Sequence, residues 1–505
     1  MNNSVALLLP LLIVVATGLV VLLVDAFVSR SRAALAWLAA GGLMVAAGAA
    51  LGQWLTWNGG WAIWRVFTGE LVLSRREPEL GFNGMVAFDK YSLFFTLLFC
   101  LVGVLTIMLS DGYLQRHRMK TGEFYALLLF VISGMIGMAL ANDLIALFVA
   151  FELMSLPTYV LAGSLLQDRR SGEAALKYFV NGAFASAILL FGLALLYGLT
   201  GSTTYQAIGE QLARIDVGDG LSILALVMIC TGFGFKVAAV PLHGWAPDVY
   251  EGAPTPVTAF MSVGIKAGAF AGVVRLFDVA LSPGWEVWST VLIVLAVLSM
   301  IVGNVLALPQ RNLKRMLAYS SIAHAGYLLL GVIAIGEDGL QQASSAVLFY
   351  LVAYAFMNLG AFGVLVLIRN RRPFAYTLDE IAGLGRSMPV LALAMTVFML
   401  SLTGVPPMAG FWGKFYLFTA LVDAHLTWLA IVAVIMSTVS AFYYLRVVWY
   451  LFFREPEGAV VELEPSEAGA TWAVTLSALG VLLVGLYPEP LIRFAQEAIK
   501  GIFAG

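Results

Sequence analysis

The chain has 505 residues, of which 61% are hydrophobic and 11% charged, and its formal net charge at pH 7 is −2. Soluble domains carry about 25% charged residues, so this composition and a mean hydropathy of +0.93 exclude an ordinary soluble globular protein. The small net charge and the lack of a basic tract exclude nucleic acid as a partner.

The apolar runs predict an all-α polytopic membrane protein, because a helix needs about 20 apolar residues to cross a bilayer. The first run lacks a basic start and a cleavage site, so we expect it to be retained as a span. In chain order, about fourteen spans are expected at 4–28, 33–57, 91–110, 123–141, 143–166, 173–200, 220–240, 255–277, 286–308, 313–335, 341–368, 389–422, 425–453 and 470–487.

Two of these spans contain helix-breaking sequences. The seventh ends at Pro241 and continues into LHGWAPDVYEGAPTP, and the twelfth holds Pro406 and Pro407. Broken helices survive at membrane depth only where they are buried in protein or line a wet cavity. Each break lies near a lysine, Lys236 or Lys414, and paired breaks in corresponding positions point to an inverted-repeat transporter core.

This pattern predicts four domains, two of them inverted five-helix repeats. They are N-terminal helices 1–3 in residues 1–122, the first repeat (helices 4–8) in 123–278, the second (helices 9–13) in 279–454, and an acidic loop, helix 14 and an amphipathic tail in 455–505. The tail carries an apolar stripe and is expected to lie along the membrane surface. A small extracytoplasmic hairpin is expected within 58–90.

Lysine and arginine gather in the loops that follow odd-numbered spans, such as Arg116, Arg169 and Arg311. Positively charged loops stay in the cytoplasm, so both termini are expected on the opposite side of the membrane.

A few charges lie where a charge is expensive. Glu152, Lys236, Lys266 and Lys414 each fall inside or beside an apolar span, and a charge at mid-membrane costs at least ~2.5–3.5 kcal/mol. Glu152 lies about 14 Å into its helix at 1.5 Å per residue, too deep to reach the surface easily. Such residues usually line an ion or proton path, and Lys236 is the natural partner of Glu152. The alternatives are an acid–base pair that only fastens helices, and lysines whose chains reach the interface.

Three further polar residues leave their roles open. His324 has an imidazole suited to proton transfer near neutrality, and a simple buried histidine is an equal alternative. Lys177 lies near the start of the sixth span, where the interface alone could explain it. His243, in the first break, is interpreted as structural rather than as part of a proton entry.

Redox and nucleotide motifs are missing from the sequence. Neither Cys100 nor Cys230 forms a CxxC motif, and no GxGxxG or GxxxxGK[ST] motif is present. The chain is therefore expected to hold no cofactor and no metal, and any driving redox chemistry is assigned to a partner.

The run GFKVAAVPLHGWAPDVYEGAPTPVTAFMSVGIKAGAF, residues 234–270, closely resembles the core of the antiporter-like subunits of respiratory complex I. Its DVYEG element is similar to subunit N of bacterial NADH:quinone oxidoreductase, and differs from subunits L and M and from Mrp-type sodium/proton antiporters. The runs NDLIALFVAFELMSLPTYVL, RNLKRMLAYSSIAHAGY and LTGVPPMAGFWGKFYLF extend the resemblance over almost the whole chain.

This resemblance implies a fold, a set of partners and roles for individual residues. Glu152, Lys236, Lys266 and Lys414 match the lysines and glutamate of the family's proton path, Lys177 a lysine of helix six, and His324 a polar position of helix ten. The implied fold has fourteen helices and two inverted repeats. The implied neighbours are subunits M and K in the bacterial inner membrane, with NADH, FMN, iron–sulfur clusters and quinone in partner subunits.

The leading hypothesis is a proton-translocating subunit of NADH:quinone oxidoreductase, driven by quinone reduction elsewhere in the complex. The alternatives are a subunit of a sodium/proton antiporter, a subunit of a ferredoxin- or other donor-driven relative of complex I, and a purely structural membrane spacer. The deep charges argue against the spacer.

Overall fold

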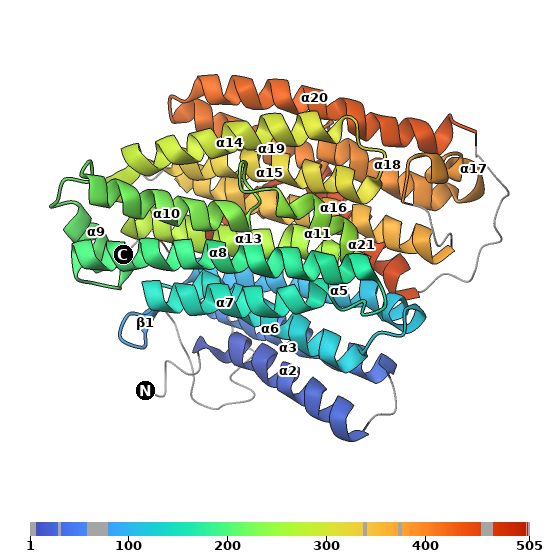
Figure 1. Ribbon diagram of the computed structural model, residues 1–505, viewed down its shortest axis with the longest axis horizontal. Helices are drawn as coiled ribbons and strands as arrows, with labels where there is room; N and C mark the ends of the chain where they lie inside the picture. Colours follow the sequence, from blue (N-terminus) through green and yellow to red (C-terminus); the bar gives the residue numbers. More distant parts are fainter. Residues whose placement is uncertain are drawn as a thin grey trace.

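Long helices lie side by side along the longest axis of the molecule, from α2 at the bottom of the view to α20 at the top (Figure 1). This computed structural model describes residues 7–28, 32–57, 79–336, 341–371, 376–455, 468–500 and 502. Sheet structure in this part is a single hairpin, in which β1 (Glu79–Gly81) pairs antiparallel with β2 (Val86–Phe88) in the register Leu80 to Ala87. The expected hairpin within 58–90 is therefore present, whereas the residues up to 78 lie outside the described part.

The first half of the chain supplies two N-terminal helices and then the helices around the first break. Their bounds are α2 Leu9–Val28, α3 Arg32–Trp57, α5 Lys90–Arg116, α6 Thr121–Leu140, α7 Leu144–Ala162, α8 Arg169–Thr200, α9 Tyr205–Leu212, α10 Gly220–Lys236, α11 Trp245–Gly252, α12 Thr255–Phe260 and α13 Lys266–Arg275. Two π-helical turns, η1 (Met261–Ile265) and η2 (Leu276–Ala280), flank α13.

The second half repeats the long-helix pattern around the second break. Its bounds are α14 Trp285–Ala307, α15 Leu313–Ile335, α16 Gln341–Arg371, α17 Leu384–Ser387, α18 Pro389–Thr403, α19 Ala409–Asp423, α20 Thr427–Phe452, α21 Ala468–Leu486 and α22 Glu489–Lys500, with short 3₁₀ turns at Ser282–Gly284 and Asp379–Ile381.

The expected polytopic all-α membrane fold is confirmed. Within the described residues, 12 helices are long and apolar enough to cross a membrane, or up to 13 when the bent pair Asp379–Ser387 and Pro389–Thr403 counts as one span. The expected count of fourteen is not confirmed, because interruptions shorten two of the expected spans. Helix α10 has 17 residues, and α18 and α19 have 15 each.

Both breaks lie where proline ends a helix. Proline lacks an N–H and clashes with the preceding turn, and the breaks contain the cis bonds Val240–Pro241 and Pro406–Pro407. Just after the helix that precedes each break, one residue adopts a left-handed backbone conformation: Ala238 has a φ of 61° and Gly404 a φ of 92°. Helix α10 ends at Lys236, four residues before the expected end at 240, so the lysine itself is the last helical residue.

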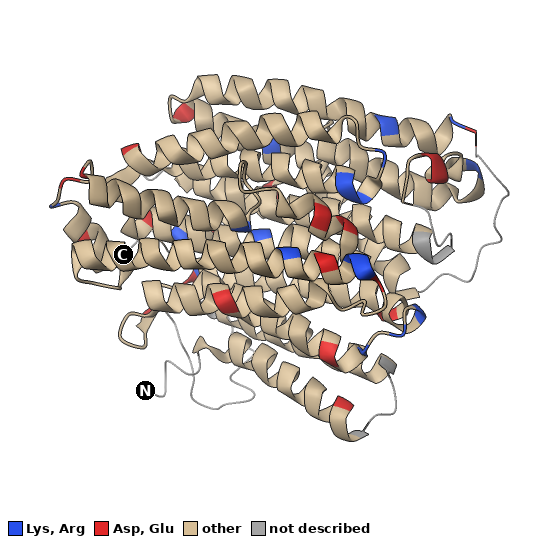
Figure 2. Cartoon of the chain, viewed as in Figure 1, with Lys and Arg blue, Asp and Glu red and all other residues tan. Residues whose placement is uncertain are grey.

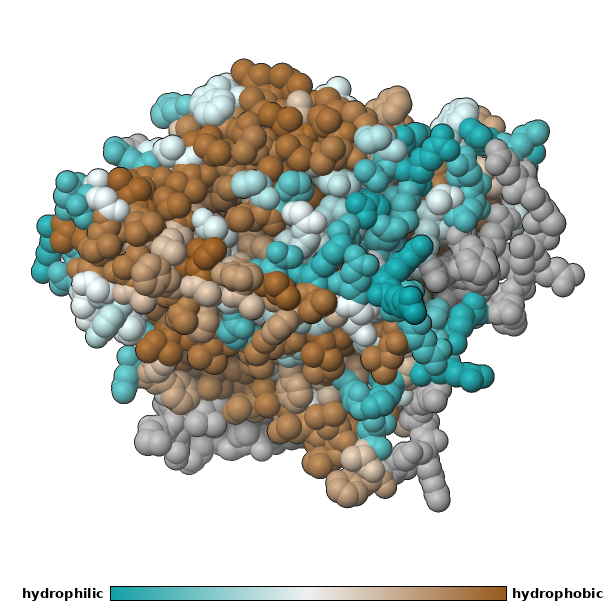
Figure 3. All heavy atoms as spheres, viewed as in Figure 1, coloured by the Kyte–Doolittle hydropathy of each residue, from teal (hydrophilic) through white to brown (hydrophobic). Residues whose placement is uncertain are grey.

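Apolar side chains cover the middle of the outer surface, and polar ones gather at its right-hand end near α11 and α17 (Figure 3). On α7 the exposed residues Ile145, Val149, Leu153, Leu156 and Val160 follow a helical period of three or four. Such an exposed apolar stripe is typical of a helix that faces lipid. In Figure 2 the charged residues are densest toward the same right-hand end, and others lie along the middle of the bundle.

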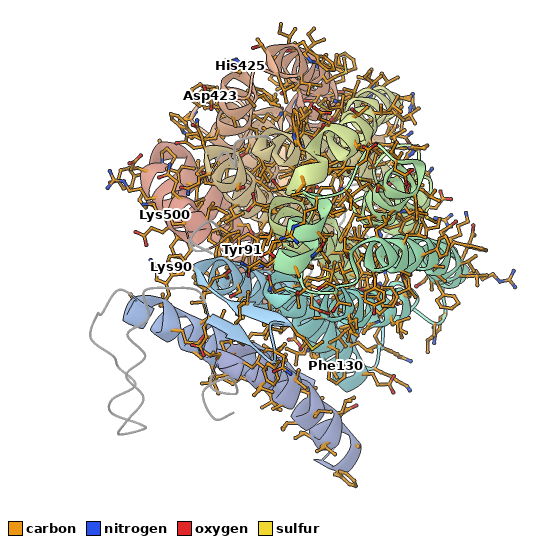
Figure 4. The ribbon with its side chains drawn as sticks, turned by 90° about the vertical axis from the view of Figure 1, so that its left-hand side faces the viewer. Lys90, Tyr91, Phe130, Asp423, His425 and Lys500 are labelled. Atoms are coloured by element: carbon orange, nitrogen blue, oxygen red, sulfur yellow. The ribbon has the colours of Figure 1, made fainter. Side chains whose placement is uncertain are left out.

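The C-terminal helix α22 packs on the protein itself rather than presenting its apolar stripe to lipid. Ile492, Ala495 and Ile499 are buried, and the ring of Phe494 lies 4.2 Å from that of Trp54. Lys90 at the start of α5 pairs with Glu497 at 3.1 Å. Lys90 and Lys500 lie at the end of the bundle that faces the viewer in Figure 4, so α22 covers this end of α5. The expected amphipathic helix is therefore present and its apolar stripe is covered by the chain's own helices, while its place along the membrane surface stays a prediction.

Candidate functional site

A row of buried polar residues

Three lysines from different helices are buried among apolar side chains. Lys236, Lys266 and Lys414 are exposed by 1%, 2% and 4%. None of the three pairs with a carboxylate in the part of the chain that the structure describes, and each binds hydroxyl or carbonyl oxygens instead. Since an unpaired buried charge is costly, these positions demand a reason beyond packing.

Lys236 binds the helix that carries Glu152. Its Nζ donates to Ser155 Oγ at 2.6 Å, and Ser155 Oγ donates to the carbonyl of Phe151 at 2.5 Å. The rings of Phe151, Tyr159 and Tyr178 surround the same nitrogen at 5.1, 5.4 and 5.5 Å, within the range of a cation–π contact. Oxygen and ring faces therefore replace water around this amine.

Glu152 lies one turn before Ser155 on α7 and forms no direct ion pair with Lys236 in the described structure. Its Oε1 is covered and has no hydrogen-bond partner. In this structure Lys236 is bonded to the Ser155 hydroxyl of the same helix, so its pairing with Glu152 stays a prediction. Leu153 and Leu156 beside Glu152 are exposed, which places the carboxylate near the outer boundary of the bundle.

Lys266 is the first residue of α13, directly after the π-helical turn η1. Its Nζ donates to the carbonyl of Ser321 and, at 2.5 Å, to Ser321 Oγ on α15. π-helical turns inside helices are frequent at functional sites. This contact joins the first half of the chain to the helix that carries His324.

His324 connects three helices. Its Nδ1 lies 2.5 Å from Tyr350 Oη on α16, and its Nε2 lies 3.0 Å from Tyr444 Oη on α20. Tyr444 also bonds Ser320, next to the Ser321 that binds Lys266. In the neutral ring one nitrogen donates and the other accepts, so the imidazole can pass a proton between its two phenol neighbours.

Lys414 lies on α19 but bonds the end of α18. Its Nζ donates to the carbonyls of Leu402 and Thr403 at 3.0 and 2.9 Å and to Ser437 Oγ on α20 at 2.8 Å. The last carbonyls of a helix have no partner within it, and a cation there is stabilised by the helix dipole. Lys414 therefore links α19, which follows the second break, to the end of α18, which precedes it.

Polar residues outside the expected set

Several uncharged residues that the sequence interpretation missed line the same region. Tyr327 presents its ring to Lys414 Nζ at 5.2 Å. Asn304 donates to Tyr327 Oη at 3.2 Å and accepts from Tyr443 Oη at 2.9 Å. Asn358 donates to Ser262 Oγ at 2.7 Å. An asparagine inside an apolar span could have indicated these polar contacts, because a buried amide needs hydrogen-bond partners.

A buried ion pair was missed as well. Arg275 donates to both carboxylate oxygens of Asp89 at 2.6 and 2.8 Å and to the carbonyl of Ala139 at 2.9 Å, and its guanidinium lies 4.8 Å from the ring of Tyr91. The two ends of the pair are 186 residues apart in the sequence. Only the fold brings them together.

Lys177 lies apart from the buried row, in a polar pocket of about 300 Å³. It pairs with Glu173 and Asp248, both at 2.7 Å, and Arg315 bonds Asp248 and Glu251 at 2.9 and 2.8 Å. Partial burial would raise the pKa of Asp248, but the hydrogen bonds and charges of Lys177 and Arg315 outweigh it and hold the pKa below its ordinary value. Helix α8 begins at Arg169, so Lys177 lies two turns into it rather than at its start.

His243 lies in the first break, as expected, with its Nδ1 covered and without a partner. Partial burial lowers its pKa. Nothing in its contacts joins it to the row of lysines.

Relatives

Comparison with known proteins finds relatives over almost the whole chain. The family described as "NADH:quinone oxidoreductase/Mrp antiporter, TM" matches residues 141–440, which include Glu152, Lys236, Lys266 and Lys414. The NADH-quinone oxidoreductase subunit N of Trichlorobacter lovleyi is 44% identical over 494 residues, covering 97% of this chain and 96% of that protein.

Solved structures agree with the sequence relatives. A chain of respiratory complex I from Thermus thermophilus with bound Aureothin is 35% identical, with a TM-score of 0.77 over 96% of this chain and 98% of that one. A chain of the Mrp complex from Dietzia sp. DQ12-45-1b has a TM-score of 0.81 over 100% and 98% of the two chains, but at 23% identity it shows the shared fold alone. The chain therefore belongs to the NADH-quinone oxidoreductase subunit N family of antiporter-like membrane proteins.

Proposed function

We propose that this chain is the proton-translocating, antiporter-like subunit N of an NADH:quinone oxidoreductase, and that it moves protons through its buried lysines and histidine. Quinone reduction in other subunits would drive it. NADH, FMN, the iron–sulfur clusters and quinone would bind to those partners, and this chain would hold no redox group.

The observation that carries the proposal is the three buried lysines bound to hydroxyl and carbonyl oxygens instead of carboxylates. A lysine that only fastened helices would be most stable opposite a carboxylate, as Arg275 is opposite Asp89. Lysine, unlike arginine, can exist as a neutral amine, and hydroxyl partners can bond either form. Such sites suit a proton that arrives and leaves.

The contacts support an order for the transfer. Glu152 and Lys236 would form the input, coupled through charge across the Ser155 turn rather than by a direct bond. Lys266 and His324 would form the central part, joined through Ser321, Ser320 and Tyr444. Lys414 would be the output. Lys177 would act at the mouth of the route, in the polar pocket beside Asp248.

We further propose the setting of the subunit. It would lie in the bacterial inner membrane beside subunits M and K, with the charged end near α11 and α17 in the cytoplasm and both termini on the other side. The two broken spans would belong to the inverted repeats 123–278 and 279–454. The parallel left-handed residues at Ala238 and Gly404 support this pairing.

Replacing Lys266 tests the proposal. In the assembled complex, reconstituted in vesicles, we expect Lys266→Met to lower the protons pumped per NADH oxidised by at least about tenfold, because methionine fills the space but carries no proton. Lys120→Met, at an exposed lysine bonded to Glu123, is the control. Normal pumping by the Lys266 variant at equal subunit content would contradict the proposal.

A second measurement separates the antiporter alternative. The same vesicles are assayed with and without sodium, and with NADH absent. Proton movement that needs NADH and is indifferent to sodium supports the redox-driven reading. Sodium/proton exchange without NADH would favour the antiporter. The subunits that co-purify identify the electron donor.

A further inference from the structure

The direction of the Lys266 side chain depends on the π-helical turn η1, which ends directly before it. Successive residues of an α-helix point about 100° apart around the helix axis, because one turn holds about 3.6 residues. A π-turn contains one residue more than an α-turn. If η1 became an ordinary α-turn, Lys266 would therefore point in a direction about 100° from the present one. The contact between Lys266 and Ser321 on α15 requires η1 to keep its π-helical form.

One hydrogen bond joins a side chain of η1 to the neighbouring helix α16. Asn358 of α16 donates from Nδ2 to Ser262 Oγ at 2.7 Å, and both residues are 0% exposed. Ser262 is the only residue of η1 that carries a hydroxyl group. Its hydrogen is already in use, because Ser262 Oγ donates to the carbonyl of Ala259 at 2.8 Å. The Ser262 oxygen is therefore the acceptor, and the amide nitrogen of Asn358 must face it.

The other contacts of Asn358 show that it does more than fill space. Its Nδ2 also donates to Tyr354 Oη, one turn earlier on α16, at 3.0 Å. The ring of Tyr354 lies 5.1 Å from the ring of His324, so Asn358 links η1 to the surroundings of that histidine. Asn358 Oδ1 is covered and has no hydrogen-bond partner in the described part of the chain. An apolar residue would avoid the cost of that oxygen, so the two donated bonds are what the amide contributes.

We propose that Asn358 is a positioning residue for the proton route. Through Ser262 it holds η1 in the π-helical form, and it thereby directs the Lys266 amine toward Ser321 and the helix that carries His324. An amide does not gain or lose a proton near neutral pH, so Asn358 acts only through the placement of Lys266. This inference rests on the proposed function, because it assigns Asn358 a part in a route that Lys266 carries.

Asn358→Leu tests the proposal in the assembled complex, because leucine fills a similar space and donates no hydrogen bond. We expect the protons pumped per NADH oxidised to fall by at least about threefold at equal subunit content, since a misplacement of about 1 Å can cost up to ~100-fold. The rate of NADH oxidation in the presence of an uncoupler should be unchanged. Asn181→Leu, at an exposed asparagine of α8, is the matched control. An unchanged proton ratio in the Asn358 variant overturns the proposal.

Substitutions of Ser262 show whether Asn358 acts through this hydroxyl. Ser262→Ala removes a single oxygen and should lower the proton ratio in the same way. Both substitutions break one bond, so the double variant should pump no less than Asn358→Leu alone. Ser262→Thr keeps the hydroxyl and should retain the wild-type ratio. Additive losses in the double variant, or a threonine variant as poor as the alanine variant, would assign the effect to packing and overturn the proposal.

An electron cryo-microscopy structure of the Asn358→Leu complex separates this inference from the proposed function. We expect η1 to be α-helical there and Lys266 Nζ to have left Ser321, a result that requires no pumping measurement. Lys266 still bonded to Ser321 would overturn the inference even where pumping is low. Normal pumping by Lys266→Met would instead refute the proposed function, whatever the position of Lys266 in the Asn358 variant.

Discussion

Glu152 is not bonded to a lysine in the described part of the chain. Its Oε1 has no partner, while Lys236 is bonded to Ser155 one turn further along the same helix. A tight ion pair would hold both groups in one charge state, since separating it leaves two unpaired charges. An acid and an amine that interact without contact can change charge one at a time.

Glu152→Gln should therefore stop proton transfer without disturbing the fold. Glutamine has nearly the same shape and imitates the protonated acid, but it cannot release a proton. We expect redox-linked acidification of vesicles to fall by at least about tenfold, with normal amounts of the subunit in the complex. Normal acidification in this variant would exclude Glu152 from the route.

Two substitutions of Lys414 test whether the site needs a proton that can leave or only a fixed positive charge. Arginine keeps the charge but does not release its proton readily, and alanine removes both. We expect Lys414→Ala to pump least and Lys414→Arg to retain part of the wild-type rate, measured at equal subunit content. Full activity in both variants would make Lys414 structural. Full activity in the arginine variant alone would mean that only a charge is needed.

At this scale the sequence predicts charges better than it predicts their partners. Glu152 and the three lysines stand out because a charge within an apolar span is costly. Ser155, Ser321 and the phenols could not be singled out, because hydroxyl groups are common in membrane helices and only packing decides which one meets a lysine. Arg275 and Asp89 were missed although Arg275 is a charge near the end of an expected span, and only the fold brings its partner, 186 residues away, beside it.

At the scale of elements, a glycine allows the two helices of the second break, α18 and α19, to pack closely. A Cβ at Gly410 of α19 would collide with the carbonyl of Ser401 at the end of α18 and approach Met357 Sδ to 2.8 Å. The end of α18 is therefore packed directly against the start of α19. Backbone cannot yield as a flexible side chain can, so the close approach requires glycine.

Gly410→Ala should destabilise the protein by about 1–3 kcal/mol, the usual cost of overpacking. Gly48→Ala on α3 is the matched control, since a Cβ there meets nothing within 4 Å. Alanine is the better helix former by about 1 kcal/mol, so the control should be neutral or slightly stabilising. Thermal unfolding of the two purified variants gives the comparison, and equal midpoints would refute the tight packing.

Helix breaks were predictable and helix ends were not. Proline and polar residues inside apolar runs marked both interruptions. The start of α8 lies four residues before the expected 173, because the apolar pattern does not include Arg169, and α10 ends four residues before the expected 240, because the apolar residues before Pro241 are not helical. Polar residues extend a helix wherever caps and tertiary partners allow, as Asp168 does for α8.

Over the whole molecule, charge is concentrated at one end, and a cluster there ties distant parts of the chain together. Asp248 on α11 accepts from Lys177 on α8 and from Arg315 on α15. Its pKa lies below the ordinary value in the folded protein. The ionised Asp248 therefore stabilises the folded protein fully above its unfolded-state pKa of about 3.9. This stabilisation is lost as the pH falls through the lower pKa that Asp248 has in the folded protein.

Asp248→Asn should lower the thermal midpoint by the same amount at every pH from about 5 to 8, and the gap should close in more acidic buffer. Asp423→Asn is the control, because Asp423 is exposed near the opposite end of the bundle (Figure 4). Midpoints are measured by differential scanning calorimetry in detergent. A gap that widened on acidification would show that the cluster does not stabilise the fold through this carboxylate.

The overall architecture followed from composition and periodicity, because lipid requires every span to be apolar and helical. The partners of the C-terminal tail did not follow. An amphipathic stripe fits a membrane surface and a protein surface equally well, and only the fold shows that Phe494 packs against Trp54 and Phe94.

The three bonds of Lys414 have a consequence in simple counting. An ammonium group has three N–H donors, and Leu402, Thr403 and Ser437 provide three acceptors, so the charged form is saturated. A neutral amine has one donor fewer and gains a lone pair, to which the Ser437 hydroxyl can donate if it turns. The two remaining N–H groups then suffice for the carbonyls of Leu402 and Thr403. The junction of α18, α19 and α20 therefore offers three hydrogen bonds to either form of the amine, and a change of its charge needs no partner to be lost.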